Sequence, residues 1–286
     1  MTTLASLVLG FTAPASLDLP RDLGRASHAI FLHAIAQHSP ALAAQLHASS
    51  QTKPFTCSNL HGGSRRAGRV LFAAGESGWL RFTGLNAAVC DALAAIAARP
   101  PAQIDLDASV VPVTLATLDA TAHPYAAATT YEALGAPHLL ARERPAARIT
   151  LRFFSPAAFR AKDQNLPLPL PRSVFGSLLD RWNAFAPIAL PDETRRFAEE
   201  CMAISRFRLR SRAWSAKQNR AQIGFVGAVA FAALNHDRYW LALMNTLADF
   251  AFFAGVGYQT TQGMGQCRRI AEMPREAREG QVADAG

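Results

Sequence analysis

The stretch AGVGYQTTQGMGQ, residues 254–266, holds four glycines within eleven residues. It follows an apolar-rich run, residues 238–253, in which Leu243 and Leu247 recur at helical spacing. Gly255 suits the C-terminus of such a helix, and the residues after the glycines suffice for one short strand. The pattern therefore predicts a helix, a glycine loop and a final strand.

The order of these elements argues against a nucleotide-binding glycine loop. In dinucleotide folds and P-loops a strand leads into the glycines, and the N-terminus of a helix receives the phosphates. Here the order is reversed, and no Gly-Lys-Ser/Thr sequence ends the loop. Contact with phosphate would use backbone N–H groups, the hydroxyls of Thr260 and Thr261, and the guanidinium groups of Arg268 and Arg269. The alternative is a tight turn without a ligand, and the glycines alone leave both open.

The charge of the chain favours an anionic partner. Half of the 286 residues are hydrophobic, enough for two modest domains, and the formal net charge is +8 at pH 7. Residues 271–286 hold two arginines and four acidic residues, so the rest of the chain carries 27 − 17 = +10. A basic body of this kind is typical of proteins that bind polyanions. Arginine far outnumbers the three lysines, which suits phosphate, although a GC-rich coding bias would give the same composition.

The four cysteines lie far apart and form no C-x-x-C pair. We therefore expect neither a metal site nor disulfides, no cofactor, and a cytoplasmic location. Residues 4–11 are apolar like the core of a signal peptide, but no Lys or Arg precedes them. No apolar run is long enough to span a membrane, so we expect no membrane partner.

The order of predicted elements is the same in both halves of the chain. In the first half we expect a strand at residues 4–11, a helix at 27–35 capped by Ser27, and a short helix at 39–47 capped by Ser39. Three strands follow at 53–60, 69–73 and 78–83, and then a helix at 86–97 and a strand at 104–117. Residues 61–69 are expected to form a surface loop. The second half repeats the order with residues 147–154, 173–185, 207–214, 222–234, 238–253 and 266–270.

This order is ferredoxin-like. We therefore predict an α+β fold of two tandem ferredoxin-like domains, residues 1–122 and 147–272, with a linker at 123–146 and a flexible tail at 273–286.

Arginines occupy every other position in one predicted strand, at Arg206, Arg208, Arg210 and Arg212. Because side chains alternate along a strand, they share one face, while Phe207, Leu209 and Ala213 share the other. A solvated face would usually mix both signs of charge, but no acidic residue is interleaved here. We interpret the arginine face as a phosphate-binding surface.

Several stretches together resemble the CRISPR-associated endoribonucleases that cut the precursor CRISPR transcript within each repeat. They are GVGYxTTxGMG at 255–265, LH at 46–47, KPFTCS at 53–58, YE at 131–132, LP at 168–169, VFGSLL at 174–179 and WN at 182–183. The resemblance spans nearly the whole chain. It implies two ferredoxin-like, RNA-recognition-type domains with the glycine loop between the last helix and the last strand.

The resemblance also implies a metal-independent cut, in which the ribose 2′-hydroxyl attacks the adjacent phosphate and leaves a 2′,3′-cyclic phosphate and a 5′-hydroxyl. Such a cut needs a base, an acid and positive charge beside the phosphate. His47 matches the family's histidine, and its place at a helix C-terminus favours the imidazolium form of a general acid. Lys53 matches a lysine found in those family members that carry a tyrosine, a histidine and a lysine at the catalytic site. It would stabilise the negative charge that develops on the phosphate.

The second catalytic group is open. Where some members carry a tyrosine, this chain has Leu32, which cannot exchange a proton. His33, His28 and His38 compete for the role, each with an alternative as an ordinary polar helix residue. We prefer His33 slightly, although it points about 100° away from Leu32 around the helix.

The RNA-binding residues that we predict come from the arginine strand, an earlier basic loop, the glycine loop and the strand after it. They are Arg65, Arg66, Arg206, Arg208, Arg210, Arg212, Gly255, Gly257, Thr260, Thr261, Gly263, Gly265 and Arg268. The expected partner is CRISPR repeat RNA, with hand-over of the product to a CRISPR effector complex, as a monomer or a homodimer. The alternative function is a non-catalytic, guide-RNA-binding subunit of a CRISPR ribonucleoprotein.

Overall fold

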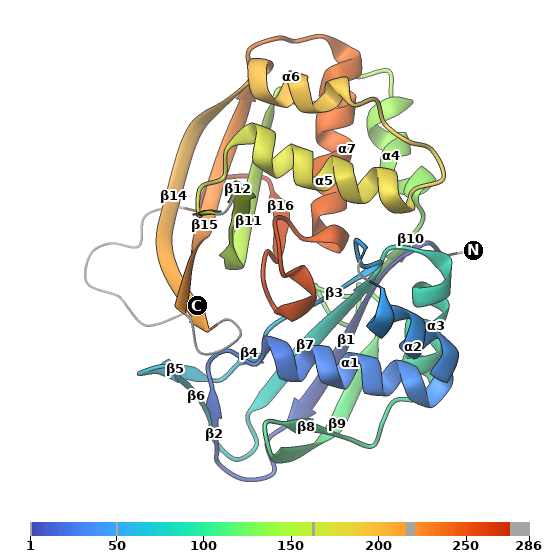
Figure 1. The fold of residues 1–286 in the computed structure, drawn as a ribbon, viewed down its shortest axis with the longest axis vertical. Coiled ribbons are helices and arrows are strands. Elements are labelled where there is room, and N and C mark those ends of the chain that lie inside the picture. Colours follow the sequence, from blue (N-terminus) through green and yellow to red (C-terminus); the bar gives the residue numbers. More distant parts are fainter. Residues whose placement is uncertain (1, 50, 162–163, 216–220, 275–286) are drawn as a thin grey trace. The chain divides into compact units, whose positions relative to one another are not determined.

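The computed structural model describes residues 2–49, 51–161, 164–215 and 221–274. The chain divides into two compact units (Figure 1). Among the described residues, the first unit comprises 2–129 and 261–263, and the second comprises 130–260 and 264–274. Residues 261–263 of the glycine loop thus belong to the first unit.

The first unit is built on a sheet in which β3, β7, β1, β9 and β8 lie in that order. Its elements are β1 (Leu4–Thr12), α1 (Gly24–His38), α2 (Pro40–Ala48), β3 (Phe55–Cys57), β7 (Ser77–Gly84), α3 (Ala87–Ala98), β8 (Gln103–Leu106) and β9 (Ser109–Thr117). In chain order the four principal strands are β1, β3, β7 and β9, with α1 after the first and α3 after the third. This is the ferredoxin-like arrangement.

Shorter strands extend this frame. β4 (His61–Gly62) pairs with β7, and β10 (Ala127–Thr129) pairs with β1. A separate sheet of three strands consists of β2 (Leu17–Pro20), β6 (Arg69–Phe72) and β5 (Ser64–Arg66).

The core of the first unit lies between the sheet and the helices. Phe31 of α1 stacks on Phe55 of β3, with ring centroids 4.3 Å apart, and lies 5.5 Å from the ring of Phe82 on β7. All three side chains are buried. Aromatic contacts of this kind add about 0.5–1.5 kcal/mol each to the burial of the rings.

The second unit repeats the arrangement with the sheet order β14, β15, β11, β16. Its principal elements are β11 (Arg148–Ala157), α5 (Pro171–Phe185), β14 (Met202–Ser215), β15 (Ala221–Ala233), α7 (Arg238–Ala254) and β16 (Cys267–Ile270). Additional elements are α4 (Tyr131–Leu139), β12 (Phe159–Ala161), β13 (Gln164–Leu166), α6 (Glu193–Cys201) and a short 3-10 helix at Thr260–Gln262. Phe175 of α5 packs on Phe231 of β15 in its core. The predicted α+β fold of two tandem ferredoxin-like domains is confirmed.

Several predicted details hold and others are wrong. Ser39 caps α2 by accepting a hydrogen bond from Leu42 N–H, with Pro40 in the first turn, as expected. Ser27 is not a cap: α1 begins three residues earlier, and Ser27 is fully buried inside it. The single strand expected at 104–117 is a hairpin, because the chain turns at Asp107 and Ala108 with positive φ at both.

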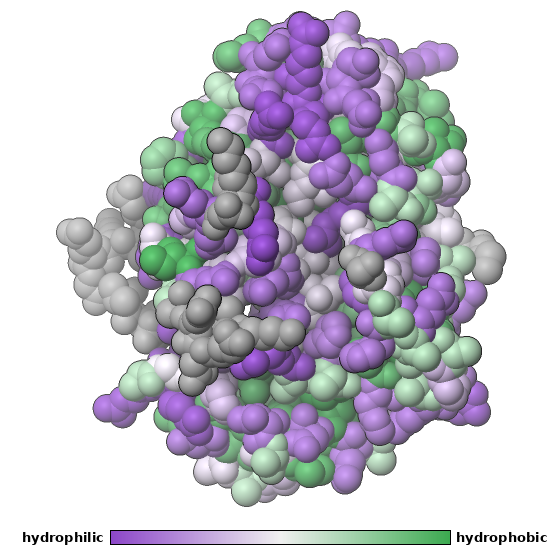
Figure 2. Space-filling model, in the orientation of Figure 1, coloured by the Kyte–Doolittle hydropathy of each residue, from purple (hydrophilic) through white to green (hydrophobic). Residues whose placement is uncertain are grey.

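Other elements were not predicted from the sequence. The surface loop expected at 61–69 contains β4 and β5, and the linker expected at 123–146 contains β10 and α4. Helix α6 was not anticipated, because its sequence ETRRFAEEC is mostly charged; Figure 2 shows hydrophilic residues gathered over it at the top of the view. The expected tail at 273–286 lies mainly outside the described residues.

Replacing Asn86 with alanine tests the start of α3. Asn86 Oδ1 accepts a hydrogen bond from Val89 N–H at 3.0 Å. Because alanine leaves this donor without a side-chain partner, we expect the free energy of unfolding to fall by about 1 kcal/mol. Chemical denaturation beside Asn86→Asp, which keeps an acceptor, is the measurement, and equal losses in both variants would contradict the capping role.

Candidate functional site

Three basic residues singled out from the sequence come together in the first unit: His28 of α1, His47 of α2 and Lys53 just after α2. We call them the His–His–Lys cluster. Lys53 Nζ donates hydrogen bonds to the carbonyl oxygens of Leu46 and of His47, the latter at 3.4 Å. The amine thus caps the C-terminus of α2, where the helix dipole favours a cation. This contact holds Lys53 at the C-terminal end of α2, where the side chain of His47 is exposed.

His28 is the most enclosed of the three. Its Nδ1 lies 2.9 Å from the carbonyl oxygen of Thr261, and its ring lies 5.6 Å from that of Phe55. Burial lowers the pKa of His28 below its ordinary value of 6.5. The hydrogen bond to Thr261 acts in the opposite direction, whereas the charges of Lys53 and His47 lower this pKa further. His28 is therefore mainly neutral at pH 7.

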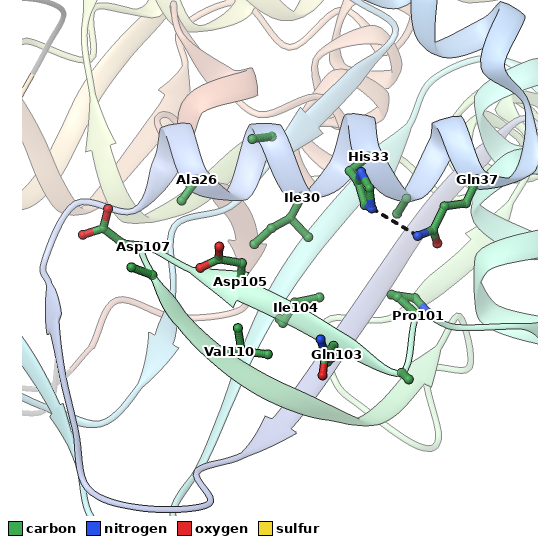
Figure 3. Close-up of a pocket in the computed structure, with 14 residues that line it drawn as sticks. Ala26, Ile30, His33, Gln37, Pro101, Gln103, Ile104, Asp105, Asp107 and Val110 are labelled. Carbon is green, nitrogen blue, oxygen red and sulfur yellow. Dashed lines mark hydrogen bonds between the residues drawn. The ribbon is translucent and has the colours of Figure 1, made fainter.

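His33 lies in a different place on α1 (Figure 3). It is exposed, shares a hydrogen bond of 3.1 Å with Gln37, and lines a groove of about 820 Å³ between α1 and the β8–β9 hairpin. Asp105 and Asp107 lie at the opposite side of this groove. Of the histidines considered for the second catalytic group, the structure places His28 with His47 and Lys53, and His33 in the groove.

His38 and Leu32 complete the comparison on α1. His38 stands in the last turn of the helix and is partly exposed. Leu32 packs against the core of the first unit, as an apolar side chain should. The position that carries a tyrosine in some relatives therefore has a structural role here.

The glycine loop is held by its own backbone. The N–H groups of Gly255, Val256, Gly257, Tyr258, Gly263, Met264, Gly265 and Gln266 all donate hydrogen bonds within the protein. A phosphate cannot use a donor that is already committed. The N–H groups of these residues are therefore not free for the phosphate binding expected from the sequence, and their carbonyl oxygens cannot take over that role because they only accept hydrogen bonds.

Two of the glycines show what their lack of a side chain permits. A Cβ at Gly257 would lie 2.3 Å from the carbonyl oxygen of Ala158, and one at Gly265 would lie 2.0 Å from that of Val256. Both residues also have positive φ. The close approach predicted from the glycines is thus made by the protein's own backbone.

The remaining loop residues differ in exposure. Gly255, Thr260, Gly263 and Gly265 are buried, whereas Gly257 and Thr261 are partly exposed. RNA contact by this loop stays a prediction, with Gly257 and Thr261 as its accessible members.

Arg181 of α5 holds the glycine loop in the second unit, and it was not predicted from the sequence. Its Nη1 donates to the carbonyl oxygen of Ala254 at 2.8 Å and to Thr260 Oγ1 at 2.7 Å, and its Nη2 donates to the carbonyl oxygen of Gly257 at 2.9 Å. Desolvation lowers the pKa of Arg181 to about 10, so it remains charged at pH 7.

Ser177, one turn earlier on the same helix, reinforces this contact. Its Oγ accepts a hydrogen bond from the N–H of Gly257 at 2.9 Å. The sequence signal for Ser177 and Arg181 is only their spacing of four residues within the apolar sequence of α5. This spacing puts both side chains on one face of the helix.

The arginines of β14 belong to a larger basic face of the second sheet. Strand register places Arg208, Ala228, Arg152 and Arg268 in one row across β14, β15, β11 and β16. Helices lie against the opposite face, where Phe231 contacts α5 and Arg269 pairs with Asp249 of α7. The sequences of these four strands contain no Asp or Glu. This arginine face therefore carries charge of a single sign.

Exposure differs along the arginine face. Arg148, Arg152, Arg206 and Arg210 are exposed, while Arg208, Arg212 and Arg268 are partly covered. Arg208 donates a hydrogen bond to the carbonyl oxygen of Pro274 at 2.5 Å. The arginines of β14 and Arg268 were predicted from the sequence, but Arg148 and Arg152 were not, because only the strand register brings them alongside.

Phe207, on the other side of β14, is exposed for 64% of its surface rather than covered by the core. β14 is also the edge strand of its sheet, with a neighbouring strand on one side only.

Arg65 and Arg66 lie on β5 in the first unit. Arg65 is partly buried and donates to the carbonyl oxygen of Leu60 at 3.2 Å, whereas Arg66 is exposed. Burial lowers the pKa of Arg65, the charge of Arg21 lowers it further, and Asp22 opposes both effects. Arg65 stays cationic at neutral pH.

Two further observations concern the described part of the chain. Within it, no helix has the length and apolar character that crossing a membrane requires. The same residues contain no group of three or more His, Cys, Asp or Glu side chains that could hold a metal ion.

Two ferredoxin-like units in tandem, one with the His–His–Lys cluster and one with an arginine-lined sheet, place this protein in the class of tandem-domain proteins of RNA-recognition type. The model of the Cas6 N-terminal domain matches residues 4–135, and that of the CRISPR-associated endoribonuclease Cas6 matches residues 151–267. Together they cover most of the sequence. The chain belongs to the Cas6 family.

Known relatives agree with this assignment. The chain is 29% identical over 136 residues to the CRISPR-associated endoribonuclease Cas6 of Mycobacterium tuberculosis, a match covering 46% of this chain and 42% of the relative. The match thus spans less than half of that relative's length.

Solved structures resemble the chain over nearly its full length. A product complex of Thermus thermophilus Cas6 is 26% identical with a TM-score of 0.77, covering 94% of this chain and 100% of that one. A second Cas6 product complex is 26% identical with a TM-score of 0.74, covering 95% of this chain and 100% of that one.

Replacing Arg181 with glutamine tests its role in holding the glycine loop. The substitution leaves acceptors at Ala254 and Gly257 without their donor, and we expect a loss of about 1–3 kcal/mol of unfolding free energy for each that water cannot reach. The matched control is Arg196→Gln on α6, where the arginine is 74% exposed and the stability should stay close to that of the wild type. Denaturant unfolding measures both, and similar stabilities would refute the role.

Proposed function

We propose that this protein is a metal-independent endoribonuclease that cuts precursor CRISPR RNA within its repeats and passes the guide RNA to a CRISPR effector complex. The observation that carries the proposal is the grouping of His28, His47 and Lys53 in a chain of the Cas6 family. These side chains supply a neutral imidazole, a second imidazole and an ammonium group. A cut by the ribose 2′-hydroxyl requires those three kinds of group.

His28 is the general base in this proposal, in place of the His33 preferred from the sequence. Its lowered pKa keeps an imidazole nitrogen free to accept a proton at pH 7. The 2′-hydroxyl gives its proton to His28 while the 2′-oxygen forms a bond to phosphorus. The position of His33, in the groove beside Gln37, supports this choice.

His47 is the general acid, and Lys53 stabilises the charge that develops on the phosphate. As the bond from phosphorus to the 5′-oxygen breaks, His47 gives its proton to that oxygen. The products carry a 2′,3′-cyclic phosphate and a 5′-hydroxyl, and the two histidines have exchanged protonation states. Lys53 can serve because its hydrogen bonds to the last carbonyls of α2 hold the ammonium beside His47.

Cleavage of RNA carrying the host's CRISPR repeat, in the presence of EDTA, tests the chemistry. We expect one cut within the repeat with a 2′,3′-cyclic phosphate end, and a rate lowered about 10²–10⁴-fold by His28→Ala or His47→Ala at unchanged RNA affinity. His33→Ala and His38→Ala are the matched comparisons on α1 and should cut normally. Loss of cutting in His33→Ala alone would return the base to that residue, and tight binding without any cut would indicate a guide-RNA-binding subunit instead.

The same reaction has a pH dependence that follows from His28. The base works only when deprotonated, and its pKa lies below 6.5. The rate under single-turnover conditions should therefore fall, as pH decreases, only below about pH 6.5. A fall that begins well above this value would be inconsistent with His28 as the base.

For RNA binding we propose the arginine face of the second sheet, including Arg148 and Arg152. Support comes from its single sign of charge and from alanines in the central strand, Ala228 and Ala230, which leave room between the longer arginine side chains. Guanidinium groups on such a surface bind the phosphates of RNA bidentately. Phosphate contacts fix the position of the RNA but carry little sequence information.

Neutralising Arg152, Arg206 and Arg210 together, each to glutamine, tests the RNA-binding face. We expect weaker binding to the repeat and to a scrambled RNA by the same factor. The slope of log K against log salt should become smaller by about 0.7 for each phosphate that the protein no longer neutralises. Arg196→Gln serves as the control of equal chemistry on α6. Unchanged affinity and slope in the triple variant would show that RNA binds elsewhere.

A further inference from the structure

The segment Thr261–Gly263 of the glycine loop makes a contact with His28 that determines which nitrogen of the ring carries a proton. The carbonyl oxygen of Thr261 lies 2.9 Å from His28 Nδ1. A carbonyl oxygen only accepts hydrogen bonds, so Nδ1 must be the donor. In the neutral ring the lone pair is then on Nε2, which is the nitrogen left to accept a proton.

The segment is fixed against β3 by its backbone. The N–H of Gly263 donates to the carbonyl oxygen of Cys57 at 3.0 Å, and Gly263 forms an isolated parallel bridge with Ser58. Asn59, the next residue, accepts hydrogen bonds from the N–H groups of Leu23 and Leu60 at 2.8 Å and 2.9 Å. The same short stretch of chain thus positions both the glycine segment and the start of α1.

Gly24 gives the segment its place against α1. A Cβ at this position would lie 1.9 Å from the carbonyl oxygen of Gln262 and 2.5 Å from its carbonyl carbon. The backbone of Gly24 is ordinary helix, so the requirement is for space and not for an unusual φ. Gly24 also stands four residues before His28, which puts both on the side of α1 that meets the loop.

We propose that residues 261–263 are a positioning element of the catalytic site, which orients His28 through the carbonyl oxygen of Thr261, and that Gly24 is the residue that admits them. The proposal rests on the proposed function for the role of His28. It gives the glycine loop a task in catalysis that is separate from contact with RNA. Gly24 and Thr261 act through His28, so they are positioning residues.

A neighbouring group other than Thr261 could also fix which nitrogen of His28 carries the proton, but the structure offers few such neighbours. The charged neighbours that influence His28 are His47 of α2 and Lys53 after it, and the ring of Phe55 on β3 lies against it. Lys53 has no acceptor, and its Nζ is directed to carbonyl oxygens of α2. The acceptor that the structure provides at Nδ1 is Thr261.

The first experiment measures the tautomer directly, by ¹⁵N chemical shifts of the histidine rings in the whole protein, with His28→Gln to assign the signal. We expect His28 to carry its proton on Nδ1 at pH 8. Gly24→Ala should displace the segment and give a mixture of the two tautomers. A wild-type signal showing the proton on Nε2 would overturn the proposal, and this result does not depend on cleavage.

The second experiment compares cleavage rate with RNA affinity. Gly24→Ala should lower the single-turnover rate several-fold at unchanged RNA affinity, because only the fraction of His28 that keeps its orientation and has the lone pair on Nε2 can accept the substrate proton. The matched control is Gly135→Ala in helix α4, where the nearest atom to the new Cβ is a side-chain carbon of Leu139 at 3.2 Å. Normal cleavage by a folded Gly24→Ala variant would overturn the proposal.

Thr261→Ala separates the two roles of the loop, because it removes the hydroxyl and keeps the carbonyl oxygen. We expect the ¹⁵N signal of His28 to be unchanged in this variant, with the proton still on Nδ1. A shifted tautomer would count against the carbonyl as the orienting atom. If wild-type protein cuts no repeat RNA at all, the proposed function fails, whereas the orientation of His28 is judged by the ¹⁵N signal alone.

Discussion

The hydrogen bonds of the glycine loop's own backbone are the constraint that fixes the conformation of the loop. In the second unit the N–H of Val256 bonds to Gly265, and the N–H of Gly265 bonds to Pro156 at the end of β11. In the first unit the N–H of Gly263 bonds to Cys57 of β3. Any side chain at the closest of these approaches would clash with a carbonyl oxygen, so the glycines are required for packing before they are required for a ligand.

In the proposed function, two kinds of basic residue have separate tasks. The arginine face has guanidinium groups that are charged at every physiological pH, which suits the capture of a phosphate backbone. The His–His–Lys cluster has imidazoles, which can exchange protons with a substrate, and burial lowers the pKa of His28. In this proposal RNA binding depends on arginines, whose charge is constant. Cleavage depends on histidines, which gain or lose a proton during the reaction.

Arg181 links the packing of the second unit to the conformation of the loop. A single guanidinium satisfies two backbone carbonyls and one hydroxyl, and its planar geometry allows all three hydrogen bonds at once. Lysine has one nitrogen and could not reproduce this pattern. Desolvation of the arginine is unfavourable, and it lowers the pKa of Arg181. The hydrogen bonds of the charged guanidinium offset this cost, because they are stronger than those that a neutral side chain would form.

Local sequence signals were sufficient wherever a short-range rule decides the structure. Alternation along β14, the Ser39-Pro40 start of α2 and the Gly255 end of α7 depend on neighbours within a few residues, and all three were predicted correctly. The same rules failed at Ser27, where the start of α1 depends on Asn59, a residue 36 positions away from Leu23. The hairpin at Asp107-Ala108 was missed because alanine is not a usual choice for positive φ, so the pair lacks a typical turn signal.

The sequence by itself determined the two ferredoxin-like units, the basic character of the chain, and the choice of His47 and Lys53 as candidate catalytic residues. The units and the basic character follow from hydrophobic periodicity and composition, and the two candidate residues follow from the resemblance to the CRISPR-associated endoribonucleases; all of these are read along the chain. Only the tertiary structure decided that His28 rather than His33 lies with them, that Arg152 stands in line with Arg208, and that Arg181 holds the loop. The physical reason is that strand register and backbone hydrogen bonds join residues far apart in the chain, and no local pattern records such distances.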